Sequence, residues 1–396
     1  MTKKSDAPAI RFKGFSDAWE QRKLSEMCGT FEYGLNAAAK EFDGNNKYIR
    51  ITDIDDASRE FLLSDLSSPD ICLDGMSKYL LSSGDIVFAR TGASVGKTYI
   101  YRENDGIVYF AGFLIRAKVN QDNDAEFVFQ STLSPSYEKY IRITSQRSGQ
   151  PGVNAQEYGE YDLFAPSKEE QQRIGHFLRG IDNLITLHQR KFEKLTNVKK
   201  SMLEKMFPQN GSSYPEIRFK GFTDPWEQRK VQDVADRFDN LRIPVAANLR
   251  VHGTTPYYGA NGIQDYVEGF THDGEFVLVA EDGANDLKNY PVKCVNGRIW
   301  VNNHAHILQG KAGIADNSFL AFAISQSDIE SLLVGGGRAK LNAETLLSIE
   351  FRLPCLQEQY RIGEYLTQLD HLITLHQREL EKLQNIKKSM LEKMFV

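Results

Sequence analysis

The chain of 396 residues has few cysteines and no long apolar segment. Its four cysteines, Cys28, Cys72, Cys294 and Cys355, are scattered without a C-x-x-C pair, which argues against a zinc site and against a disulfide framework. No run approaches the roughly 18–20 apolar residues that span a membrane, and the opening MTKKSDAPAI contains no apolar signal-peptide core. These absences predict a cytoplasmic protein.

Recognisable catalytic motifs are absent as well. The segment RTGASVGKTYIY, Arg90–Tyr101, is similar to the phosphate-binding motif G-x-x-x-x-G-K-[ST]. Gly92 and Gly96 enclose three residues instead of four, however, and such a loop must wrap its backbone N–H groups around an anion of fixed size. We also find no [DN]-P-P-[FYW] motif of amino-methyltransferases, no glycine-rich methyl-donor loop and no P-D…E-x-K nuclease set. None of these catalytic motifs is therefore recognisable in the sequence.

The composition is that of an ordinary globular protein, with 41% hydrophobic and 26% charged residues. A chain of this length can form two or three domains. The formal net charge of −5 counts against a nucleic-acid-binding protein when taken alone, but a sum over the chain does not describe a single basic face.

An internal repeat decides the domain organisation. IRFKGFSDAWEQRK at Ile10–Lys23 returns as IRFKGFTDPWEQRK at Ile217–Lys230. The segment Glu170–Phe207 returns as Glu358–Phe395, with 27 of 38 paired positions identical, while the residues between the shared blocks diverge. We predict four parts: a lead-in with a first variable domain at 1–167, a long helix at 168–207, a lead-in with a second variable domain at 208–355, and a long helix at 356–396.

Each shared segment has the pattern of a coiled-coil helix. Proline is absent from Glu169–Met206, and apolar residues recur at alternating steps of four and three. The predicted coiled-coil seam comprises Ile174, Leu178, Ile181, Ile185 and Leu195 in the first copy and Ile362, Leu366, Leu369, Ile373 and Leu383 in the second. The seam continues with Phe192, Met202 and Met206 in the first copy and with Leu380, Met390 and Met394 in the second. Its two polar positions in each copy hold His188 and Lys199, and His376 and Lys387, which we expect to set the register. The simplest packing places the two helices against each other, antiparallel.

A second apolar stripe runs along a neighbouring face of the first long helix. Phe177, Leu184, Leu187 and Val198 form this stripe. It is either a seat for another subunit or one side of a wide core face, and the sequence does not distinguish the two.

Both variable domains have the pattern of mixed α/β structure. KYIRITDI, GDIVFAR, KTYIYR and GIVYFAGFLIRAKV predict strands in the first domain, with a helix over Asp124–Gln146. GEFVLVAEDGA and GRIWVNNHAHIL predict strands in the second, with a helix over Phe319–Val334. GDIVFARTGAS corresponds to GEFVLVAEDGAN, where the Gly-Lys ending is lost. A phosphate-binding loop would not be needed in only one of two matched domains.

Loops of both domains carry side chains suited to DNA, because Arg and Lys contact guanine or phosphate while Asn and Gln pair with adenine. The candidate DNA contacts are Arg90, Thr91, Ser94, Lys97, Arg147, Gln150 and Asn154 in the first domain, and Tyr257, Tyr258, Asn261, Asn285, Lys288, Arg338, Lys340 and Asn342 in the second. A merely solvated loop residue is the alternative at each position, and Asn154 and Asn342 can instead cap a turn. His304 and His306 have strand spacing for two metal ligands, but no third ligand is evident, so no metal site is predicted.

Over essentially its whole length the chain resembles the specificity (S) subunits of type I restriction-modification enzymes. The resemblance is carried by the repeated W-E-Q-R-K at Trp19–Lys23 and Trp226–Lys230, by GDIVFARTGASVGK, TPYYGANGI and GEFVLVAEDGA, and by E-Q-x-R-I-G at the start of both long segments. It implies an α/β fold in which two mixed α/β target recognition domains are joined by two long helices that form an antiparallel coiled coil.

The resemblance also implies a DNA-recognition subunit that catalyses nothing itself. Each variable domain would read one half of a bipartite, asymmetric target in double-stranded DNA, and the helices would set the spacing. Two modification (methyltransferase) subunits would dock on the helices and use S-adenosylmethionine, and two restriction (translocase and nuclease) subunits would use ATP and Mg; this chain would hold no cofactor. Two alternatives stay open: a coiled-coil scaffold whose domains bind proteins, and an ATP-binding enzyme that uses the Arg90–Tyr101 loop.

Overall fold

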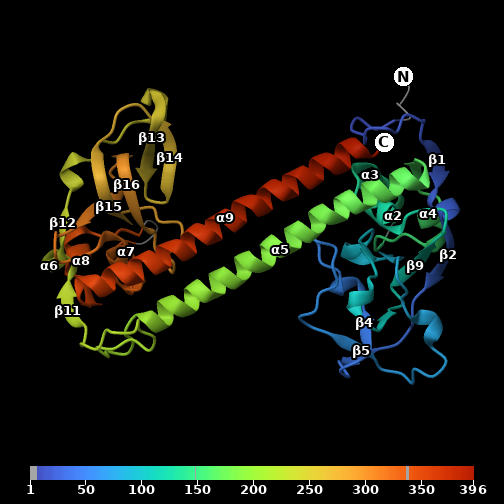
Figure 1. Cartoon of the computed structure of the whole chain (residues 1–396), viewed down its shortest axis with the longest axis horizontal. Helices are drawn as coiled ribbons and strands as arrows, with labels where there is room; N and C mark the ends of the chain where they lie inside the picture. Colours follow the sequence, from blue (N-terminus) through green and yellow to red (C-terminus); the bar gives the residue numbers. More distant parts are fainter. Residues whose placement is uncertain (1–6, 148, 336–338) are drawn as a thin grey trace. The chain divides into compact units, whose positions relative to one another are not determined.

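The computed structural model describes residues 7–147, 149–335 and 339–396. The chain divides into two compact units, called here unit 1 (Met1–Arg190 with Gln377–Val396) and unit 2 (Lys191–His376). Each unit contains one variable domain, the beginning of one long helix and the end of the other (Figure 1). The units thus share both long helices, whereas the four predicted parts treat the helices as separate segments. No helix in the described ranges carries an apolar stretch of membrane-spanning length.

Unit 1 is built on a four-stranded antiparallel sheet with the order β2-β9-β6-β7. Its strands are β2 (Cys28–Tyr33), β6 (Asp85–Ala89), β7 (Thr98–Ile100) and β9 (Leu114–Val119). Three two-stranded pairs are β1 (Glu20–Lys23) with β10 (Asp162–Ala165), β3 (Ala39–Glu41) with β5 (Ser67–Pro69), and β4 (Lys47–Ile49) with β8 (Val108–Phe110). The short helices are α1 (Leu24–Met27), α2 (Ala125–Ser131), α3 (Pro135–Thr144) and α4 (Ala155–Gly159).

Unit 2 contains a larger sheet of six strands, in the order β12-β17-β15-β16-β13-β14. Its strands are β12 (Ala235–Arg237), β13 (His252–Gly259), β14 (Gly262–Val267), β15 (His272–Ala280), β16 (Val292–Val301) and β17 (Ala305–Gly310). A separate pair consists of β11 (Glu227–Lys230) and β18 (Glu350–Leu353). The short helices are α6 (Val231–Val234), α7 (Asn317–Ser325) and α8 (Ala343–Ser348).

Two predicted helices are shorter than expected. The segment Asp124–Gln146 forms α2 and α3 instead of one helix, because Ser134 accepts a hydrogen bond from Tyr137 N and starts a new helix with proline in its first turn. The predicted helix Phe319–Val334 ends with α7, and only a 3₁₀ turn at Glu330–Leu332 follows.

The repeated W-E-Q-R-K closes each variable domain. Glu20 to Lys23 form β1, which pairs with β10 directly before the first long helix, and β11 pairs with β18 in the same way before the second. Trp19 and Trp226 are buried, with ring centroids 5.9 Å from Phe127 and 5.7 Å from Phe319. The repeated lead-in therefore packs each variable domain against the start of a long helix.

The lead-in also binds both long helices, α5 (Lys168–Met206) and α9 (Leu356–Met394). In unit 1 Arg11 donates to both carboxylate oxygens of buried Glu170, at 2.7 and 2.8 Å, near the start of α5. Ile10 N donates to Lys393 O (2.9 Å) near the end of α9. The equivalent contacts in unit 2 are Arg218 with Glu358 and Ile217 N with Lys205 O.

Within each unit the long helices lie side by side and run antiparallel (Figure 1). Apolar side chains bury this contact: Ile174, Leu178 and Ile181 with Leu391 and Met394 in unit 1, and Ile362, Leu366 and Leu369 with Met206 in unit 2. The seam residues nearer the helix centres, Ile185, Leu195, Ile373 and Leu383, are half-buried. The predicted fold of two mixed α/β domains joined by an antiparallel helix pair is confirmed.

Candidate nucleic-acid interface

In the loop that resembles a phosphate-binding motif, the backbone groups of Gly96 form hydrogen bonds with other residues of the chain. Gly96 N donates to Tyr158 Oη (3.1 Å) and to Ala89 O (3.0 Å), and Tyr137 Oη donates to Gly96 O (3.1 Å). Gly96 has a φ of 84°, and a Cβ there would lie 2.5 Å from the Ile141 side chain. Glycine at this position thus serves chain packing, and its N–H does not point at an anion. This geometry argues against the ATP-binding alternative.

Several candidate DNA contacts of unit 1 are already engaged within the chain. Lys97 Nζ lies 2.5 Å from Asp56 Oδ1, and its side chain is only 16% exposed. Arg147 forms an ion pair with Glu157. Asn154 accepts a hydrogen bond from Glu157 N (2.9 Å) and caps α4, which agrees with the capping role that the sequence offered as an alternative to DNA contact. These three side chains have structural roles.

The four other candidates of unit 1 lie around the end of β6. Thr91 pairs with Gly152 in an isolated β-bridge, which brings the Gln150 segment beside Arg90. A Cβ on Gly92 would lie 2.9 Å from Gln150 Nε2, so the two loops are in contact. Ser94 lies in the single 3₁₀ turn that follows, Gly92–Ser94.

Two aromatic residues that the sequence did not single out complete this surface. The Arg90 guanidinium carbon lies 5.3 Å from the ring centroid of Tyr33 and 5.6 Å from that of Phe113. Tyr33 and Phe113 are 47% and 56% exposed, although large aromatic residues are usually buried. We call Arg90, Tyr33 and Phe113 the arginine cluster.

The tyrosines predicted to contact bases in unit 2 are buried instead. Tyr257 and Tyr258 are 1% and 7% exposed. Tyr257 Oη accepts from Val245 N (2.9 Å), and the Arg250 guanidinium lies over its ring at 4.2 Å. The Tyr257 ring stacks on Trp300 with centroids 6.4 Å apart, and Tyr258 belongs to an apolar cluster with Phe276 and Val295. They are therefore not available for stacking on DNA bases.

The polar candidates of unit 2 lie on adjoining loops. Asn261 donates to Gly283 O (2.9 Å) and accepts from Asn285 N (2.9 Å), so it joins the β13–β14 turn to the loop after β15. Asn285 and Lys288 are exposed on that loop. Lys340 pairs with Asp282 in an isolated bridge, and Asn342 precedes α8. Arg338 lies outside the described residues.

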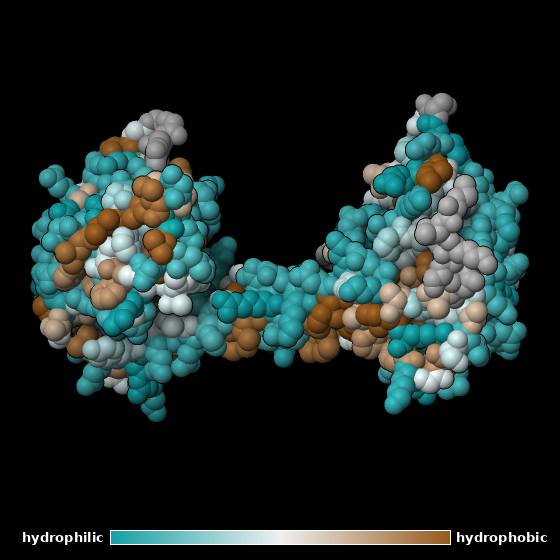
Figure 2. Space-filling model, turned by 90° about the horizontal axis from the view of Figure 1, so that it is seen from above, coloured by the Kyte–Doolittle hydropathy of each residue, from teal (hydrophilic) through white to brown (hydrophobic). Residues whose placement is uncertain are grey.

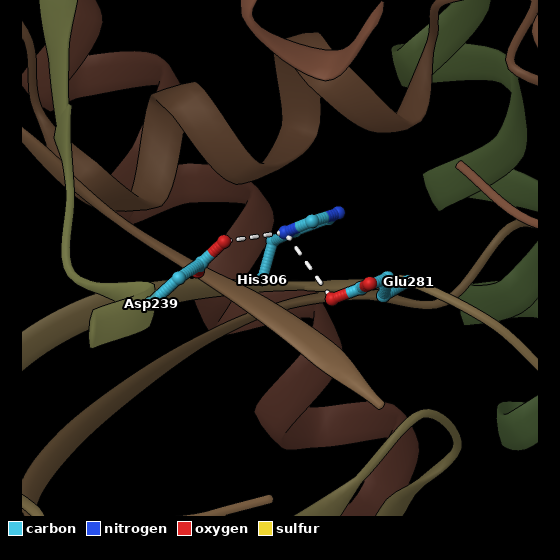
Figure 3. Close-up of side chains that lie close together, drawn as sticks. All are labelled: Asp239, Glu281 and His306. Atoms are coloured by element: carbon cyan, nitrogen blue, oxygen red, sulfur yellow. Dashed lines mark hydrogen bonds and ion pairs between the residues drawn. The ribbon is translucent and has the colours of Figure 1, made fainter. Parts of the chain in front are cut away.

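A network of charged side chains connects these loops to the six-stranded sheet. Asp239, Glu281 and His306 point toward one another (Figure 3). His306 Nδ1 lies 2.7 Å from Asp239 Oδ2 and 3.7 Å from Glu281 Oε2, and its Nε2 lies 2.9 Å from the carbonyl oxygen of Leu341. Since a carbonyl oxygen only accepts, Nε2 carries a proton. The network thereby ties the Leu341 segment to the sheet.

The same three side chains are close enough to hold a metal ion, but their carboxylates already have cationic partners. Glu281 binds Lys340 at 2.8 Å and Arg242 at 2.5 Å. Burial raises the pKa of Glu281, but these hydrogen bonds outweigh it and hold that pKa below its usual value. Burial likewise raises the pKa of Asp239, and the His306 and Ile307 hydrogen bonds lower it further than burial raises it. His304 binds a different carboxylate, Asp282, so the two histidines do not share a ligand site.

The two units place opposite charges at one equivalent position. Val153 N donates to Arg90 O at 2.9 Å in unit 1, and Leu341 N donates to Glu281 O at 2.8 Å in unit 2. The neighbouring bridges, Thr91 with Gly152 and Asp282 with Lys340, also correspond. Arg90 and Glu281 therefore directly follow equivalent strands, β6 and β15, in the same backbone frame.

Comparisons with known proteins agree with this duplicated frame. The chain matches the family described as type I restriction modification DNA specificity domain twice, over residues 16–197 and 223–385. It is 41% identical over 163 residues to a putative type I restriction enzyme specificity subunit of Haemophilus influenzae, a match that spans 41% of this chain and 42% of that protein. It is 22% identical to the putative type I restriction enzyme MjaX specificity subunit of Methanocaldococcus jannaschii, over 94% of this chain and 92% of that protein. The crystal structure of a type I restriction-modification S subunit from M. genitalium has a TM-score of 0.75 at 13% identity, covering 98% of this chain and 99% of that one, which shows a shared fold.

Proposed function

The chain belongs to the type I restriction modification DNA specificity family, and from this premise we propose that its two units read the two halves of a split, asymmetric DNA target. The observation that carries the proposal is the equivalent position with opposite charge, Arg90 in unit 1 and Glu281 in unit 2. Two copies of one frame with different loop chemistry suit two different base sequences. Two-fold symmetric recognition would need identical loops.

We propose that the long helices carry the modification subunits. Leu184 and Leu187 are each 45% exposed on α5, and the residues 188 positions later, Leu372 and Leu375, are 40% and 45% exposed on α9. Hydrophobic side chains (brown) interrupt the hydrophilic surface of the long helices (Figure 2). Matched apolar positions on both helices fit two copies of one partner. Leu184 and Leu187 of the stripe predicted on the first helix are thereby assigned to docking, whereas Phe177 packs on Phe12, with ring centroids 5.7 Å apart, and Val198 packs against the core of unit 2.

Catalysis belongs to the partners in this proposal. The modification subunits supply S-adenosylmethionine chemistry, and two restriction subunits supply ATP-driven translocation and cleavage. The chain itself acts as a recognition subunit without a cofactor. Its net charge of −5 suits this division, since the partners provide part of the phosphate contacts that dominate affinity for DNA.

Sequencing of methylated adenines tests the proposal. The full chain is expressed with its modification subunit in a host that lacks adenine methylation. We expect a split motif with two unrelated halves and a constant gap. A stable complex that methylates no such motif would contradict the proposal and leave the protein-binding scaffold as the better explanation.

A further inference from the structure

We propose that Arg90, which lies beside the rings of Tyr33 and Phe113, recognises a guanine in the half-site of unit 1. This inference rests on the proposed function, because it names the base chemistry that one of the two readers selects. Its geometry comes from three segments that meet at the end of β6: the end of β2, the turn before β9, and the Gly152–Val153 segment.

The first argument concerns charge. The two other described cationic candidates of unit 1, Lys97 and Arg147, form ion pairs with Asp56 and Glu157. Arg90 forms none with the carboxylates of the described residues; its polar contact is a hydrogen bond from Nε to Gly112 O (3.1 Å). Its charge is thus available to a ligand, whereas binding through Lys97 or Arg147 would first break an ion pair.

The second argument concerns geometry. Arg90 N donates to Phe113 O (3.0 Å), and its own carbonyl accepts from Val153 N (2.9 Å), so the backbone is fixed on both sides. The Nε hydrogen bond and the two rings orient the guanidinium, which leaves the Nη atoms as paired donors. Such a fork matches O6 and N7 of guanine in the major groove. Because the side chain is ordered before binding, less conformational entropy is lost on contact.

The third argument concerns the rings. Two exposed aromatic rings beside a guanidinium reduce its hydration and strengthen its interactions. Tyr33 is itself held in place, since its Oη accepts from Ala155 N at 3.3 Å. Phe113 at 56% exposure offers apolar contact to a neighbouring base pair, such as a thymine methyl group. Tyr33 and Phe113 are therefore positioning residues for Arg90.

The residue at the equivalent position in unit 2 restricts this guanine recognition to unit 1. Glu281 is bound to Lys340 and Arg242 there, so the described residues of unit 2 present no free guanidinium fork at this place. The guanine contact of Arg90 should consequently appear in one half-site only.

The test compares the methylation motifs of the wild type, Arg90→Gln, the double variant Tyr33→Leu with Phe113→Leu, and Arg142→Gln. Arg142 is an exposed arginine at the end of α3 and is the matched control. Each chain is expressed with its modification subunit, and the complex is checked for assembly and thermal unfolding. Duplexes with each of the four bases at the affected position then give the discrimination factor.

We expect Arg90→Gln to make one guanine position degenerate in one half-site, with discrimination reduced by about 5- to 150-fold. The double variant should relax the same position less, and Arg142→Gln should leave the motif unchanged. An unchanged motif in Arg90→Gln overturns the inference, and so does weaker methylation at every site with the motif intact, which would identify a phosphate contact. Absence of any split motif in the wild type would refute the proposed function itself.

Discussion

Asp182 and Lys387 form an ion pair of 2.6 Å between the two long helices, and Lys199 and Asp370 form its counterpart at 2.5 Å. The two pairs are equivalent in the internal repeat, because Asp370 lies 188 positions after Asp182 and Lys387 lies 188 positions after Lys199. The pairs are 17 residues apart on each helix: from 182 to 199 along α5, and from 387 back to 370 along α9. The two lysines predicted to set the register therefore each contact a carboxylate of the antiparallel partner helix.

Reversing the charge of one lysine tests this register. Lys387→Glu places a second carboxylate beside Asp182, and we expect the free energy of unfolding to fall by about 1 kcal/mol. Adding Asp182→Lys should recover only part of the loss, because Asp182 also accepts a hydrogen bond from Gln130 (2.7 Å). Urea unfolding of the single and double variants gives the coupling energy. The neighbouring exposed Lys388→Glu is the control, and an equal loss there would mean that the pair has no specific role.

Two glycines of α5 should respond oppositely to alanine. A Cβ on Gly175 would lie 2.5 Å from Asp124 Oδ1, the atom that caps α2, so Gly175→Ala should cost about 1–3 kcal/mol. A Cβ on Gly180 would have no atom outside its own helix within 4 Å, so Gly180→Ala should stabilise the helix by up to about 1 kcal/mol. Thermal unfolding compares the two. A stabilising Gly175→Ala would show that the contact between α5 and α2 adjusts easily.

The sequence predicts the frame of this protein better than its surface. The heptad pattern predicts the long helices. The structural role of E-Q-x-R-I-G is visible only in the structure: Gln171 Oε1 accepts a hydrogen bond from Asp124 N (3.0 Å), and Gly175 has no Cβ that would prevent the close approach of α2. The arginine cluster could not be predicted, because Tyr33 reaches Arg90 through the sheet order β2-β9-β6, which no local pattern reveals. Conversely, Tyr257 and Tyr258 look like binding residues in the sequence, but Tyr257 packs against Trp300 and Arg250, and Tyr258 is buried in an apolar cluster.

The Asp239 and Glu281 network predicts a dependence of stability on pH. Folding lowers the pKa of both carboxyl groups, so the unfolded chain binds their protons more readily. Their contribution is complete above the unfolded pKa values of about 4 and is lost as the pH falls through the lower folded values. Asp239→Asn should cost about 1–3 kcal/mol at pH 7. The difference in thermal unfolding from the wild type should shrink as the pH approaches 3.

The control for this prediction is Glu268→Gln, which changes an exposed carboxylate of unit 2. Its unfolding temperature should stay close to that of the wild type throughout the titration. A difference between the wild type and Asp239→Asn that is constant from pH 7 to pH 3 would show that the network does not titrate as described.

The family resemblance implies that the long helices set the target spacing, and we test this role with a matched insertion. One heptad between Arg190 and Lys191 and another between Arg378 and Glu379 lie opposite each other in the antiparallel register. The Asp182–Lys387 and Lys199–Asp370 pairs are both kept, since each lies wholly on one side of the insertion.

Seven residues lengthen each helix by about 10 Å, which corresponds to about three base-pair steps. The methylated motif should keep both half-sites and gain a longer gap, as measured by adenine-methylation sequencing. A heptad inserted into α5 alone shifts the seam against its partner, so one ion pair must break and methylation should be lost. An unchanged gap in the matched insertion would mean that something other than helix length sets the spacing.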